Sequence, residues 1–159
     1  MSEVSHPAIR QNPPLLIVED SNEDFEAIER FIGRSPIFVP IYRCVNGEQA
    51  LAFLYHSGKY IQPETAPRPG MIVLDLNLPG TDGREVLHRI KQDDNLKTIP
   101  VVVFTTSNNP KDILDCYNYG VNSYIVKPIN FSQLKQNIQM LVDYWFGVTT
   151  LPDSPKNSS

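Results

Sequence analysis

Four short apolar runs constrain the fold of this chain most strongly, because each one ends beside a residue with useful chemistry. The runs are Leu15 to Val18, Met71 to Leu74, Val101 to Phe104 and Tyr124 to Val126. Continuous runs rich in β-branched residues are typical of strands that are buried on both faces, as in a parallel sheet covered by helices. Sites in such sheets lie beyond the carboxyl ends of the strands. The residues that follow the runs are therefore expected to share one edge.

The segments between the apolar runs have helical periodicity, so strand and helix patterns alternate along the chain. The expected strands are Leu15 to Glu19, Phe38 to Val45, Met71 to Leu74, Ile99 to Phe104 and Ser123 to Val126. Asn46, with Gln49 three residues later, is expected to cap one helix, and Asn109 followed by Pro110 another. In the second of these helices Ile113, Leu114 and Tyr117 are expected to pack inward.

Five strand-then-helix units predict an α/β fold with a doubly wound, five-stranded parallel sheet in the order 2-1-3-4-5, which is a flavodoxin-like arrangement. Residues 14–146 are expected to form this domain, with a polar arm at 1–13 and a tail at 147–159. The segment 57–70 is rich in proline and glycine and is expected to be a long surface loop.

Composition excludes several classes of function. A formal net charge of −4 gives no basic excess for binding nucleic acid. The longest apolar runs are far shorter than the roughly 20 residues that a membrane span needs, and the first residues contain no signal-peptide core. We therefore expect a protein of the cytoplasm that binds neither nucleic acid nor membrane.

Three acids follow the first two apolar runs. Glu19 and Asp20 come after the first, and Asp75 comes after the third predicted strand. If these strands are neighbours, three carboxylates lie within a few ångström and raise one another's pKa unless a cation separates them. Mg²⁺ fits such a cluster, since it prefers oxygen ligands and keeps positions open for water or a phosphate.

Two further residues complete a site for phosphoryl chemistry at the same edge. Thr105 follows the fourth predicted strand, and Lys127 follows the fifth. A hydroxyl and a compact positive charge both suit a phosphoryl oxygen. Each of these residues has an ordinary structural interpretation when taken alone, because an acid at a strand end is often only a helix cap. Their joint placement predicts phosphoryl transfer to the carboxylate of Asp75.

The chain resembles the receiver domains of two-component response regulators. The matching motifs are Val18-Glu19-Asp20, the run from Val73 to Gly83, Val103-Phe104-Thr105-Thr106 and Val126-Lys127-Pro128. The resemblance implies that Asp75 accepts a phosphoryl group from a phosphohistidine on a sensor histidine kinase. It also implies that Glu19, Asp20, Asp75 and the backbone carbonyl of Asn77 hold Mg²⁺, while Thr105 and Lys127 bind the phosphoryl oxygens.

The same resemblance implies a switch rather than an enzyme with repeated turnover. Thr105 would move toward the phosphoryl group, Tyr124 would turn inward, and the surface of the fourth helix, fifth strand and fifth helix would change. A cis bond between Lys127 and Pro128 is expected, as in that family. Thr106 is bulkier than the alanine or glycine often found at its position, which would hinder access to the phosphoryl group.

A narrower resemblance is to the small response regulators of cyanobacterial phytochromes. It depends on the proline-rich loop before Met71, the Val103 to Ser107 run, and Tyr144-Trp145-Phe146 with Thr150-Leu151-Pro152. It implies a phytochrome-type light-sensing kinase as the phosphoryl donor. It also implies a homodimer.

Two other functions remain open at this point. A haloacid-dehalogenase-like phosphatase also uses a strand-end aspartate, Mg²⁺, a hydroxyl and a lysine. That family has an Asp-x-Asp pattern, whereas this chain has Asn77 in the second position. A phosphorylation-independent interaction module is the other alternative, although such a module does not need all of the acids.

Overall fold

The computed structural model describes residues 12–153, and within them five parallel strands form one sheet. The strands are β1 (Leu15–Val18), β2 (Ile41–Cys44), β3 (Met71–Leu74), β4 (Val101–Thr105) and β5 (Ser123–Val126). Their order is β2-β1-β3-β4-β5. The predicted fold class and strand order are therefore confirmed.

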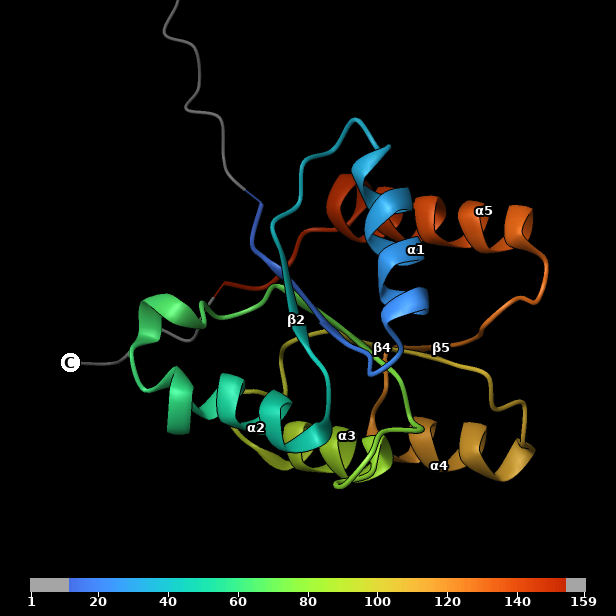
Figure 1. Cartoon of the computed structure of the whole chain (residues 1–159). Helices are drawn as coiled ribbons and strands as arrows, with labels where there is room; N and C mark the ends of the chain where they lie inside the picture. The colour runs from blue at the N-terminus through green and yellow to red at the C-terminus, as the bar shows by residue number, and fades with distance from the viewer. Residues whose placement is uncertain (1–11, 154–159) are drawn as a thin grey trace, which may run out of the picture.

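Helices cover both faces of the sheet (Figure 1). On one face lie α1 (Asn22–Gly33) and α5 (Phe131–Val142), and on the other α2 (Gly47–Tyr55), α3 (Gly83–Gln92) and α4 (Pro110–Tyr119). Short helical turns η1 (Gly58–Tyr60) and η2 (Pro63–Thr65) lie in the predicted 57–70 loop, and a π-helical turn η3 (Asp143–Val148) continues α5. Within residues 12–153, no helix is long and apolar enough to cross a membrane.

The hydrophobic core has two parts, one on each face of the sheet. Side chains alternate along β1, so Leu16 and Val18 pack toward one face while Leu15 and Ile17 pack toward the other. All residues of β1, β3 and β4 are buried, which explains their unbroken apolar sequences. The core thus fixes the strand ends, and the loops after them carry the polar residues.

The two asparagine caps that the sequence predicts are confirmed. The side chain of Asn46 accepts a hydrogen bond from the Gln49 N–H at 2.8 Å, and that of Asn109 accepts one from the Lys111 N–H at 2.9 Å. Pro110 occupies the first turn of α4, where its missing N–H leaves no helical bond unmade. Both helices therefore start directly after the strand-end loops.

Two strands begin later than predicted, and in both cases a proline is the reason. β2 begins at Ile41 after Pro40, and β4 begins at Val101 after Pro100. A proline has no N–H to donate to a ladder, so it stands at the start of a strand rather than inside it. The residue Phe38, expected in a strand, is 78% exposed.

The predicted inward face of α4 is wrong at two of its three positions. Leu114 is 61% exposed and Tyr117 is 49% exposed, whereas Cys116 is fully buried. Ile113 is only half-buried, in the turn before Cys116. The helix therefore packs against the core through a stripe that contains Cys116 and Tyr119, and Leu114 and Tyr117 face outward.

The domain boundaries stay a prediction. Most of the arm at 1–13 and the last six residues of the tail at 147–159 lie outside the described residues.

Candidate functional site

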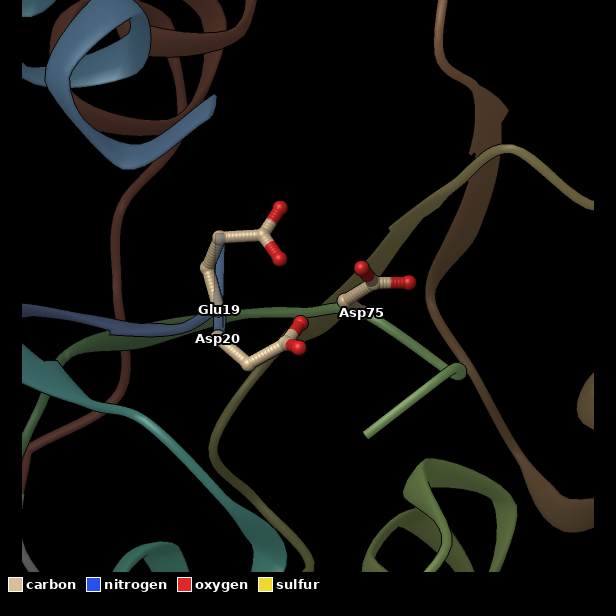
Figure 2. A group of neighbouring side chains, drawn as sticks. All are labelled: Glu19, Asp20 and Asp75. Carbon is tan, nitrogen blue, oxygen red and sulfur yellow. The ribbon is translucent and has the colours of Figure 1, made fainter. Parts of the chain in front are cut away.

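Three carboxylates meet where β1 and β3 end. Val18 and Leu74 are partners in the two strands, and the Asp75 N–H donates to the Val18 carbonyl at 3.0 Å. Glu19, Asp20 and Asp75 each place one carboxylate oxygen within 4.8 Å of the others. Figure 2 shows Glu19 and Asp20 at the end of one strand beside Asp75 on its neighbour. The predicted convergence of the three acids is confirmed.

This cluster fits a divalent cation. Glu19 is 2% exposed and Asp75 is 7% exposed, while Asp20 lies at the surface. Carboxylates packed so closely repel one another, and a hard cation with oxygen ligands relieves that repulsion. The exposed Asp20 leaves one side of the cluster open to solvent and to an incoming group.

Lys127 brings a positive charge to the same acids from the end of β5. Its ammonium donates hydrogen bonds to Glu19, to Asp24 Oδ2 at 2.8 Å and to Asp75 Oδ2 at 3.1 Å. Its side chain is only 9% exposed. Burial alone lowers the pKa of Lys127, but the bonds to Asp24 and Glu19 outweigh burial and raise it. Lys127 is therefore a firmly charged partner of the acidic cluster.

Asp24 is a site residue that the strand-end pattern of the sequence does not locate. It lies in the first turn of α1, where the Ser21 side chain caps its N–H at 3.2 Å. That turn directs the carboxylate toward Lys127. The only signal in the sequence was a further acid four residues after Asp20, which is equally typical of an ordinary first helical turn.

We expect the substitution Asp24→Asn to have a small effect on stability. The Asp24 side chain is 43% exposed, so its ion pair with Lys127 is screened by water and the free energy of unfolding should fall by about 0.5–1 kcal/mol. Urea unfolding of the variant and of Glu23→Gln, which removes a neighbouring exposed acid from the same turn, provides the comparison. Equal losses in the two variants would show that Asp24 contributes no specific contact.

The pKa of Glu19 is shifted toward neutrality. Burial raises it from 4.5 to about 7, the Lys127 hydrogen bond opposes that rise, and the charge of Asp75 adds to it. A raised folded-state pKa means that the contribution of Glu19 to stability is full below its unfolded value of 4.5 and is lost as the pH rises through about 7. Ionised Glu19 is therefore disfavoured in the metal-free cluster, and a cation bound to its carboxylate would favour the ionised form.

Thr105 and Tyr124 lie on neighbouring strands at the same edge. Thr105 is fully buried at the end of β4, and its carbonyl accepts the Lys127 N–H at 2.7 Å. Its hydroxyl oxygen accepts the Ser107 N–H at 3.4 Å. Tyr124 is half-buried and donates its hydroxyl to the Ser107 carbonyl at 2.9 Å. The proximity expected of these residues is observed, whereas their roles as switch residues stay predictions.

The loop after β3 is held close to the site. The Asn77 N–H donates to Asp75 Oδ1 at 3.2 Å. Gly83, at the start of α3, lies so close to Asp75 and Leu76 that a Cβ there would meet the Asp75 carbonyl oxygen at 2.3 Å. Only glycine permits this approach, which returns the chain to the strand end immediately after the loop. The proposed metal contact of the Asn77 carbonyl stays a prediction.

The cis bond expected before Pro128 is wrong. Every peptide bond within residues 12–153 is trans, including the one that joins Lys127 to Pro128. The trans isomer is intrinsically favoured before proline by about 0.5–1 kcal/mol.

Comparison with known proteins agrees with the resemblance to receiver domains that the sequence motifs show. Residues 15–139 match the family described as the response regulator receiver domain. The response regulator Rcp1 of Synechocystis is 43% identical over 143 residues, which are 89% of this chain and 95% of that protein.

Two solved structures extend the similarity to three dimensions. The phosphorylated cyanobacterial phytochrome response regulator RcpA is 41% identical with a TM-score of 0.84, and the Mn²⁺-bound form of Rcp1 is 42% identical with the same TM-score. Each alignment covers 89% of this chain and 99% of the solved chain. The carboxylate cluster, the adjoining lysine and these similarities lead to one assignment: the chain belongs to the response regulator receiver family.

Proposed function

We propose that Asp75 accepts a phosphoryl group with Mg²⁺ held by Glu19, Asp20, Asp75 and the Asn77 carbonyl. The observation that carries this proposal is the cluster of three carboxylates at adjacent strand ends with Lys127 bonded to Asp75 at 3.1 Å. Mg²⁺ would neutralise negative charge on the carboxylates and on the transferred group. The relative Rcp1 has been solved with Mn²⁺, which supports a divalent cation here.

In the transfer, an Asp75 oxygen bonds to phosphorus as the phosphorus–nitrogen bond of a phosphohistidine breaks. The electron pair of the broken bond returns to the imidazole nitrogen of the donor. Lys127 contacts an Asp75 oxygen and is placed to hold charge on the transferred group. The Thr105 hydroxyl would exchange its contact with the Ser107 N–H for a phosphoryl oxygen. These steps transfer one group to the protein and describe a signalling switch rather than repeated turnover.

The donor that we propose is a phytochrome-type sensor histidine kinase. Response regulators of two-component systems receive their phosphoryl groups from sensor histidine kinases. The similar solved structure of RcpA is named as a cyanobacterial phytochrome response regulator. The Asn77 side chain lacks the second carboxylate of a haloacid-dehalogenase-like phosphatase. No contact in the described site favours that alternative.

The output surface that we propose is formed by α4, β5 and α5, and it would contact a partner or a second copy of the chain. Several large apolar side chains on or beside these elements are exposed. They are Leu114, Tyr117, Val126, Ile129, Met140 and Tyr144. Large exposed apolar groups on adjoining elements are typical of protein interfaces. A homodimer is part of this proposal.

Phosphotransfer from a radiolabelled phytochrome-type kinase tests the proposed function. We expect label to move from the kinase to the wild-type protein in Mg²⁺ and to remain on the kinase in EDTA, because the carboxylates and the phosphoryl group then repel. Transfer that is equal in both buffers would contradict the metal requirement. Absence of transfer from several phytochrome-type kinases and from acetyl phosphate would contradict the function itself.

The raised pKa of Glu19 predicts a pH-dependent Mg²⁺ affinity. Mg²⁺ binds the ionised carboxylate, so Glu19 with a pKa of about 7 must lose its proton on binding. We expect the affinity to rise by up to ~10-fold per pH unit below that pKa and to level off above it. Isothermal titration in buffers of different ionisation enthalpy measures both affinity and proton release. Glu19→Gln is expected to bind Mg²⁺ more weakly and without this proton release. If proton release is unchanged in this variant, the released proton comes from another group.

A further inference from the structure

A polar network joins α3 and α4 outside the carboxylate cluster. Arg84, in the first turn of α3, donates to Asp112 of α4 through Nε–Oδ1 at 2.9 Å and Nη2–Oδ2 at 2.7 Å. The Ser107 hydroxyl donates to the same Asp112 Oδ2 at 2.6 Å. We call these three residues, Arg84, Asp112 and Ser107, the α3–α4 clamp. Figure 1 shows the two helices side by side on one face of the sheet.

The geometry of the clamp distinguishes it from an ordinary surface ion pair. The Arg84 and Asp112 side chains are 29% and 17% exposed, and their contact is bidentate. Such a pair fixes both direction and distance, unlike a single contact between flexible chains. The Arg84 and Ser107 hydrogen bonds lower the pKa of Asp112 to about 2. Arg84 is itself held by Asp82, the cap of α3, through two contacts of 3.0 Å.

Ser107 connects the clamp to the residues that are proposed to sense the phosphoryl group. Its hydroxyl bonds to Asp112, its N–H to the Thr105 hydroxyl oxygen, and its carbonyl accepts the Tyr124 hydroxyl. Three atoms of one residue thus meet three different elements of the fold. A displacement of Thr105 would therefore act on Ser107, whose other two contacts are with Asp112 and Tyr124.

We infer that Arg84 and Asp112 are positioning residues that hold Ser107, so that Thr105, Tyr124 and α4 change place together. The inference deepens the proposed function, since it takes the phosphoryl group as the signal. Arg84 and Asp112 each lie in the first turn of a helix that follows a strand-end loop, Arg84 after the Asp75 loop and Asp112 after the Thr105 loop that contains Ser107. The clamp therefore links the ends of these two loops and fixes the position of one loop relative to the other.

Hydrogen exchange tests the clamp without any phosphoryl group. Asp112→Asn and Ser107→Ala are each expected to raise amide exchange in residues 106–112 by roughly 10-fold, because the loop loses its anchor. Asp115→Asn is the matched control, since it removes an equal charge from the same helix where Asp115 pairs only with Lys111 at 2.8 Å. Asp115→Asn should change amide exchange in residues 106–112 by less than about twofold. Equal exchange in clamp and control variants would overturn the inference.

Binding of beryllofluoride with Mg²⁺, followed by ¹⁹F NMR, tests the link to the site. Asp112→Asn is expected to weaken this binding by about fivefold, because the mimic must then order a loop that the clamp no longer holds. Tyr124→Phe added to Asp112→Asn should weaken it little further, since both act through Ser107. Independent, multiplied effects in the double variant would overturn the coupling. Equal beryllofluoride affinities of Asp112→Asn and Asp115→Asn would also overturn the coupling.

The two arms separate failure of the clamp from failure of the proposed function. If wild type binds no beryllofluoride while exchange responds to Asp112→Asn as expected, the clamp stands and the proposed function fails. If wild type binds the mimic while the clamp variants behave like Asp115→Asn in both arms, the function stands and the clamp is wrong.

Discussion

Replacement of Asp75 by asparagine is expected to abolish phosphoryl acceptance while leaving the fold intact. Asparagine has nearly the shape of aspartate, so the 3.2 Å contact with the Asn77 N–H can persist through the amide oxygen. The amide, however, lacks the charged oxygen that attacks phosphorus. Labelling of Asp75→Asn by the phosphorylated kinase should therefore fall to background, which makes this the largest functional effect predicted for a single substitution.

Two controls distinguish loss of the acceptor from loss of any carboxylate and from unfolding. Asp94→Asn makes the same chemical change at a side chain that is 92% exposed and pairs only with Lys97, and it should accept label at the wild-type rate. Urea unfolding of Asp75→Asn should show a cooperative transition like that of wild type. Persistent labelling of folded Asp75→Asn would place the acceptor on another residue and contradict the assignment.

The substitution Lys127→Met is expected to have the largest effect on stability, and Mg²⁺ should reduce that effect. The ammonium is the cation that contacts buried Glu19 and Asp75. Its loss leaves two buried carboxylates without their positively charged partner, which should cost about 3 kcal/mol in the free energy of unfolding in EDTA. Saturating Mg²⁺ binds only the folded cluster and replaces part of the lost positive charge, so the loss should be smaller in its presence.

Urea unfolding in EDTA and in Mg²⁺ at one pH measures both parts of this prediction. Lys111→Met is the matched control, because its side chain is 81% exposed on α4 and contacts Asp115 rather than the acidic cluster. The control should lose less than about 1 kcal/mol in either buffer. A loss for Lys127→Met that is the same with and without Mg²⁺ would show that the cation does not occupy the carboxylate cluster.

The site residues at the ends of the buried strands could be predicted from the sequence. A buried parallel strand has an apolar sequence on both faces, so the first polar residue after it marks the edge of the sheet. That reasoning located Glu19, Asp20, Asp75, Thr105 and Lys127, and the structure brings the elements that carry them to one edge. Strand order supplied the remaining step, because the predicted order places β1 beside β3, as the structure shows.

The parts that depend on side-chain direction could not be predicted in the same way. Asp24 and Asp112 each lie in the first turn of a helix, where an acid is expected for helix stability alone. Their contacts with Lys127 and Arg84 join residues far apart in the chain. The exposed Leu114 and Tyr117 show the same limit, because several apolar stripes on α4 were compatible with its periodicity and packing selected the one with Cys116.

Chemical trapping of the aspartyl phosphate shows whether Asp75 carries the phosphoryl group. Borohydride reduces an aspartyl phosphate to homoserine, so wild-type protein phosphorylated in Mg²⁺ can be reduced, digested and sequenced by mass spectrometry. We expect homoserine at position 75 alone, and none in protein that was kept in EDTA. Homoserine at another acidic position, Asp20 for example, or phosphorylated protein in which position 75 stays aspartate, would contradict this expectation.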